Sequence, residues 1–151
     1  MKKRLYILVF IIGFCSCSNG QSKNNIDNNT TDSIIKLKMY LSAFGVESDG
    51  FPSIDVVIDF SKDTSICVKS YYHPAYKRAT YSLTKSEMEL IYELLKNTDI
   101  EKLKTEYTVE KTDQPTSTIT IYTTKKTFVI EDYGLVGEYP LQELYEIVYK
   151  F

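Results

Sequence analysis

The chain has 151 residues, a formal net charge of −2 and a hydrophobic fraction of 43%. This length is enough for one domain of ordinary size, and the slight acidity argues against nucleic acid as an electrostatically held partner. One histidine and three cysteines are too few for a dedicated zinc site. We therefore expect neither a metal nor a cofactor.

The first seventeen residues are typical of an exported lipoprotein precursor. A basic start, Lys2 to Arg4, is followed by an uninterrupted apolar run from Leu5 to Phe14. A membrane-spanning helix needs about 20 apolar residues, so this shorter run indicates a signal peptide. Small Ser16 directly before Cys17 resembles a lipobox. The sequence predicts removal of residues 1–16 and attachment of acyl chains, palmitate among them, to Cys17.

The alternative is an ordinary signal peptide that leaves Cys17 as a free thiol. After Cys17, the segment Ser18 to Asp32 is rich in Asn, Ser and Thr, which is typical of a flexible tether. Cleavage would remove three basic residues and take the net charge from −2 to −5. Ser18 after the cysteine resembles sequences sorted to an outer membrane. The stretch Ser18 to Ser22 lacks acidic residues, which favours the periplasmic face over the cell surface.

Residues 33–151 are expected to form one α+β domain. Ile34 to Leu41 alternates with a period of two, which predicts a strand with Ile35, Leu37, Met39 and Leu41 on its buried side. Ile54 to Phe60 repeats this alternation. Ser61 to Asp63 is a turn into a third strand from Thr64 to Tyr72, and Tyr76 to Ser82 is a candidate fourth strand.

A helix follows these strands. Thr84 and Glu87 have the spacing of a capping box, and Leu83 and Met88 that of a hydrophobic staple. An apolar stripe then extends to Asn97, and its members are Met88, Ile91, Leu94 and Leu95. Acidic residues on the polar side argue against an interfacial membrane helix. The stripe therefore predicts packing on the sheet.

The remaining sequence predicts a helical turn, a hairpin and a last helix. Asp99 to Leu103 has the pattern of a turn, and Thr116 to Thr123 pairs with Thr127 to Asp132. Pro140 suits a first helical position, and the stripe after it consists of Leu141, Leu144, Tyr145, Val148 and Phe151. The order β-β-β-(β)-α-β-β-α predicts an α+β fold, with two helices packed on one face of a mainly antiparallel sheet.

At this point the chain resembles a family of small bacterial lipoproteins that share a domain of unknown function. The resemblance extends from the predicted link before the second strand to the last predicted helix. The matching residues are Phe44-Gly45, Pro52, Ile54–Phe60, Thr84–Leu95, Leu103, Tyr107, Thr112–Pro115, Ile119–Ile121, Phe128–Ile130 and Asp132-Tyr133. Many relatives carry a cysteine pair around the Phe-Gly link, and this chain lacks that pair. The resemblance implies the fold and an envelope location, and it implies no activity.

Cysteine usage excludes an intrachain disulfide in the mature protein. Cys15 would leave with the signal peptide and the sulfur of Cys17 would be acylated, which leaves Cys67 alone. Cys67 lies in an apolar run, so we expect a small buried strand residue.

Catalytic motifs are absent from the sequence. It contains no G-x-S-x-G nucleophile motif and no glycine-rich nucleotide motif. Two carboxylate pairs, Glu110 with Asp113 and Glu131 with Asp132, could in principle serve acid–base hydrolysis. Glu131 and Asp132 would point to opposite faces of a strand, however, and Asp113 is explained by a turn before Pro115.

Tyrosine is unusually frequent, with 13 residues in a chain that has no tryptophan. Tyr71, Tyr72, His73 and Tyr76 crowd one segment and form the candidate binding surface. Exposed tyrosines favour protein or glycan contacts, although half-buried filler at a sheet edge is the alternative. The sequence thus favours a non-catalytic envelope module that binds a protein or glycan. A small envelope hydrolase with paired carboxylates is the alternative.

Overall fold

The structure is a computed structural model that describes residues 32–42 and 51–150. The predicted signal peptide, Cys17, most of the predicted tether, the Phe44-Gly45 link and Phe151 lie outside these residues. Within the described part of the chain, no helix is both long enough and apolar enough to cross a membrane.

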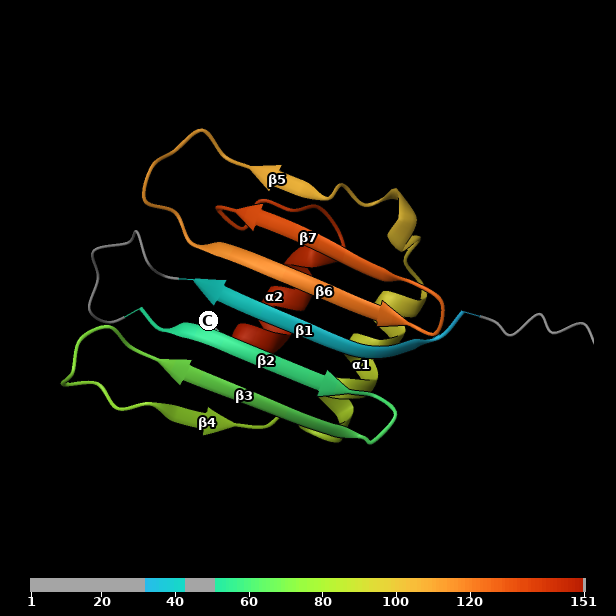
Figure 1. Cartoon of the computed structure of the whole chain (residues 1–151), viewed down its shortest axis with the longest axis horizontal. Helices are drawn as coiled ribbons and strands as arrows, with labels where there is room; N and C mark the ends of the chain where they lie inside the picture. The colour runs from blue at the N-terminus through green and yellow to red at the C-terminus, as the bar shows by residue number, and fades with distance from the viewer. Residues whose placement is uncertain (1–31, 43–50, 151) are drawn as a thin grey trace, which may run out of the picture. The chain divides into compact units, whose positions relative to one another are not determined.

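Seven strands form one sheet, and two helices lie against it (Figure 1). The strand order across the sheet is β4-β3-β2-β1-β6-β7-β5. The strands are β1 (Ile34–Ser42), β2 (Ser53–Asp59), β3 (Thr64–Ser70), β4 (Ala79–Tyr81), β5 (Glu106–Thr108), β6 (Thr116–Thr123) and β7 (Thr127–Tyr133). The helices are α1 (Lys85–Lys96) and α2 (Leu141–Tyr149), with a short 3-10 turn, η1 (Ile100–Lys102), after α1.

The sheet is mixed, so the expectation of a mainly antiparallel sheet is wrong. Strand β5 runs parallel to β7, with Tyr107 beside Asp132. Strand β5 was not predicted, because its three residues are too few for an alternating pattern and only Tyr107 is buried. The chain reaches this edge from β4, at the opposite edge of the sheet, through α1 and η1, and the connection from β5 to its parallel neighbour β7 passes through β6. The α+β class itself holds approximately.

Both helices cover the same face of the sheet (Figure 1). The central strand β1 points Leu37, Met39 and Leu41 toward them, and all three are at most 3% exposed. Leu37 lies between Ile58 of β2 and Ile121 of β6. Each such side chain contributes about 1.5–3 kcal/mol on burial, so this layer is the main source of stability.

Among the described residues, no helix lies on the other face of the sheet. The predicted alternation of β1 fails only at its start, where a register shift separates Ile34 from Lys36. Because of this bulge, Ile34 packs against the core and Ile35 is 39% exposed. The expected inward position of Ile35 is therefore wrong, since one extra residue reverses the side-chain direction.

The predicted capping box is confirmed. The Glu87 backbone N–H donates to Thr84 Oγ1 over 3.3 Å, and the Thr84 N–H donates to the Glu87 carboxylate over 2.7 Å. Of the predicted stripe on α1, Met88, Ile91 and Leu95 are buried. Cys67 is free and fully buried in β3, as expected for a small apolar residue.

Candidate functional site

The four residues predicted as a binding surface lie in the loop between β3 and β4. The rings of Tyr71 and Tyr76 stack with centroids 5.3 Å apart, and the His73 ring meets Tyr76 edge-on at 6.0 Å. Two hydrogen bonds shape the turn, from the Ala75 N–H to His73 Nδ1 (3.2 Å) and from the Tyr76 N–H to the His73 carbonyl (3.1 Å). The structure thus brings the rings of Tyr71, His73 and Tyr76 together.

The fourth member, Tyr72, is 82% exposed, and Tyr76 is 48% exposed. Lys77 and Arg78 follow in the same loop, and both are exposed. We call Tyr71, Tyr72, His73 and Tyr76 the aromatic loop. It offers ring faces and hydroxyl groups at the surface, which together favour contacts with a protein or a glycan.

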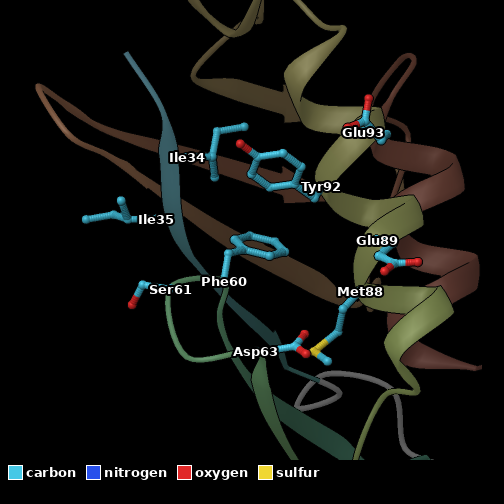
Figure 2. Close-up of a pocket in the computed structure, with 9 residues that line it drawn as sticks. All are labelled: Ile34, Ile35, Phe60, Ser61, Asp63, Met88, Glu89, Tyr92 and Glu93. Atoms are coloured by element: carbon cyan, nitrogen blue, oxygen red, sulfur yellow. The ribbon is translucent and has the colours of Figure 1, made fainter. Parts of the chain in front are cut away.

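A second candidate site is a groove between α1, the start of β1 and the turn from β2 to β3. Its volume is about 620 Å³, within the range of ligand pockets. Figure 2 shows its lining side chains, which are Ile34, Ile35, Phe60, Ser61, Asp63, Met88, Glu89, Tyr92 and Glu93. This groove was not predicted from the sequence, because its walls come from three segments that are distant in the sequence.

Two aromatic rings lie next to each other in the groove (Figure 2). The centroids of Phe60 and Tyr92 are 5.4 Å apart in an edge-to-face arrangement. The charged lining residues are all acidic, namely Asp63, Glu89 and Glu93. The groove is therefore apolar inside and negatively charged at its rim.

The two carboxylate pairs considered for hydrolysis lie in different surroundings. Glu131 is exposed whereas Asp132 is completely buried, so the predicted opposite orientation is confirmed. Glu110 and Asp113 are exposed in the loop before β6, where Asp113 has a φ of 59°. No group of three or more potential metal ligands occurs among the described residues.

Asp132 is the one buried carboxylate in the described part of the chain. It accepts hydrogen bonds from the Val136 N–H (2.8 Å), the Gly137 N–H (2.7 Å) and the Tyr145 hydroxyl (2.6 Å). Burial, and then the bond to Asp132, raise the pKa of Tyr145. This network joins β7, the loop after it and α2, so it stabilises the fold.

Comparison with known families gives one match. A model of the family described as "Domain of unknown function (DUF6438)" matches residues 50–151. This region includes β2 to β7, both helices and the aromatic loop. The chain has no significant match to a curated protein or to a solved structure.

Proposed function

The chain belongs to the DUF6438 family of domains of unknown function, and from that premise we propose that it is a non-catalytic binding module of the bacterial cell envelope. In this proposal a lipid on Cys17 holds the domain at a membrane, on the periplasmic face of the outer membrane. The basic start, the short apolar run and the Ser16-Cys17 step support the anchor. The segment Ser18 to Asp32 would serve as the tether.

The observation that carries the binding function is the geometry of the aromatic loop. The Tyr71–Tyr76 stack and the hydrogen bond to His73 Nδ1 hold the rings in place. A ring that is already ordered loses less conformational entropy on binding than a mobile side chain. Tyr72 and Tyr76 keep 82% and 48% of their surface exposed. A partner would therefore bury the exposed part of the ordered Tyr76 ring at a small entropic cost, and Tyr72 would add contact area.

The partner is expected to be an envelope protein or a glycan. Tyrosine rings suit both, because the ring contributes contact area while the hydroxyl forms hydrogen bonds. Lys77 and Arg78 extend the surface with exposed cationic groups, which would strengthen the attraction to acidic groups on the partner.

Affinity capture tests this function. The tagged, lipidated protein would be recovered from its own envelope, and its bound proteins and saccharides identified by mass spectrometry. Replacing Tyr71, Tyr72 and Tyr76 together by Ala should abolish capture of the specific partner. Tyr40→Ala is the matched control, because Tyr40 is 38% exposed on the open face of the sheet, away from the aromatic loop.

Circular dichroism would establish that the triple variant is folded. Capture that persists in a folded triple variant would contradict the assignment of binding to the aromatic loop. Equal loss of capture in Tyr40→Ala would show that the effect is not specific to that loop.

A further inference from the structure

We propose that the groove between α1, β1 and the β2–β3 turn binds a small organic cation with an apolar body, of the alkylammonium class. This site is separate from the aromatic loop, and none of its lining residues belongs to that loop. The inference therefore does not depend on the proposed function.

The shape of the groove suits an alkyl or aryl body. Met88 is 7% exposed, and Ile34 and Phe60 pack against the core from the opposite wall. The edge-to-face contact of Phe60 with Tyr92 fixes both rings. Because these side chains are already ordered, an apolar ligand would bury surface without rearranging the walls.

The charge of the lining residues favours a positively charged ligand. Asp63, Glu89 and Glu93 line the groove, and no Lys, Arg or His does. Figure 2 shows the Asp63 carboxylate pointing toward Met88. An anionic ligand would be repelled, whereas a cation would be attracted by both the carboxylates and the ring faces.

One ammonium group of the protein itself already lies next to both a carboxylate and an aromatic ring. Lys96 Nζ is 3.1 Å from Glu93 Oε1 and 5.9 Å from the centroid of the Tyr92 ring. This contact shows that a carboxylate and a ring from the same helix can hold an ammonium group together. Lys96 itself is not a lining residue of the groove, but its ion pair satisfies the Glu93 carboxylate.

The Asp63 end offers the same chemistry without an internal cation. Asp63 forms no ion pair with any of the described residues. Glu89 has only a long contact with Lys85, at 3.9 Å, and both side chains are largely exposed. We therefore place the cationic head of the ligand between Asp63 and Glu89, with its apolar body against Met88 and Phe60.

The two methionines of the domain provide a direct readout. Met88 lines the groove, whereas Met39 is 2% exposed within the core face of β1. The whole chain, reconstituted with zwitterionic lipid, would be labelled at its methionine methyl groups and observed by NMR. Hexyltrimethylammonium, hexanesulfonate and hexanol would be titrated separately, because they share an alkyl chain and differ in charge.

The cation should shift the Met88 signal in a saturable way and leave the Met39 signal unchanged. The sulfonate should bind at least about tenfold more weakly, a factor that corresponds to roughly 1.4 kcal/mol. Asp63→Asn combined with Glu89→Gln should weaken binding of the cation about threefold to tenfold, in line with exposed charge pairs. The same double variant should leave the binding of hexanol unchanged. Asp55→Asn, on the open face of β2, is the matched control.

Three results would overturn the proposal. Equal affinity for the cation, the sulfonate and the alcohol would show a merely apolar surface. Absence of any saturable Met88 shift would show that the groove binds none of these probes. A saturable Met88 shift with a Lys- and Leu-containing peptide, but not with the small cation, would assign the groove to a polypeptide instead.

Discussion

The carboxylate of Asp132 is completely buried, and three donors converge on it from the loop after β7 and from α2. A side chain at Gly137 would press on this group, because an added Cβ would lie 2.7 Å from Asp132 Oδ2 and 2.5 Å from Leu141 Cδ1. The glycine therefore permits the close approach that its own N–H needs to reach the carboxylate. The loop after β7 is therefore arranged around the carboxylate of Asp132.

Replacing Asp132 by Asn should destabilise the domain by about 2–3 kcal/mol. An amide keeps one acceptor oxygen but turns an NH₂ group toward groups that are themselves donors, and hydrogen bonds to charged groups are worth about 1.5–3 kcal/mol. Urea unfolding would measure the change. Glu131→Gln is the control, since its exposed side chain should change stability by less than about 0.5 kcal/mol. Equal stabilities of the two variants would contradict this role for Asp132.

The buried tyrosines of α2 predict a loss of stability at high pH. Burial is the main cause that raises the pKa of both Tyr145 and Tyr149, whereas tyrosine in the unfolded chain titrates near about 10. A raised pKa in the folded state contributes stability that is fully present below the unfolded pKa. This contribution should be lost as the pH rises above about 10.

Urea unfolding between about pH 8 and pH 11.5, together with phenolate absorbance, would test the tyrosine effect. Tyr145→Phe should be less stable at neutral pH, because Asp132 loses a donor. The same variant should show a smaller decrease above about pH 10, since one titrating group is gone. An unchanged slope in Tyr145→Phe would show that other groups cause the alkaline loss.

At the scale of elements, α1 is fixed at its start by local hydrogen bonds. The mutual bonds of Thr84 and Glu87 satisfy two backbone N–H groups that would otherwise lack partners. Glu87 also forms a 3.0 Å ion pair with Lys150, directly after α2. Hydrogen bonds, first from the Thr84 backbone and then from Lys150, lower the pKa of Glu87. One side chain thus joins the beginning of one helix to the end of the other.

Thr84→Ala should lower the free energy of unfolding by about 1 kcal/mol, within the range of about 0.5–2 for N-cap residues. Chemical denaturation would measure the loss. Thr84→Ser should restore most of it, because the serine hydroxyl accepts the same bond from the Glu87 N–H. Failure of the serine variant to recover stability would assign the effect to the threonine methyl group instead.

The elements with a strong period could be predicted from the sequence. The capping box and apolar stripe predicted α1, and alternation predicted β1 and β2. The hairpin of β6 and most of β7 was predicted from its β-forming residues and the turn between them. Strand β5 could not be predicted, because a parallel edge strand of three residues has no pattern of its own and depends on its neighbour β7. The mixed character of the sheet was missed for the same reason.

The two candidate sites differ in whether they could be predicted from the sequence. The aromatic loop could be predicted because its residues lie within six positions of one another, from Tyr71 to Tyr76. The groove could not, because Ile34, Phe60 and Tyr92 become neighbours only when the sheet forms and α1 packs on it. Its acidic lining is similarly divided between a turn and a helix.

At the scale of the whole molecule, the helices of the described part of the chain all lie on one face of the sheet, and none of them covers the other, open face (Figure 1). The open face carries Tyr40, Ile66 and Val129, which are 38%, 62% and 48% exposed. These apolar side chains are separated by Lys38 and Thr120, which lie in the same cross-strand row as Val129. The mixture is typical of a solvated sheet face, where single apolar residues are common.

The proposed anchor makes the sharpest prediction about the whole protein. Cys17→Ser should abolish acylation and release the protein from the membrane fraction, because two or three acyl chains hold a protein firmly and none are then attached. Cys15→Ser is the matched control, and it should leave both cleavage and membrane association unchanged. Intact mass of the mature N-terminal peptide would show cleavage before Cys17 and the added acyl mass. A mature Cys17 without acyl chains would remove the anchor and, with it, the argument that the binding partner lies in the envelope.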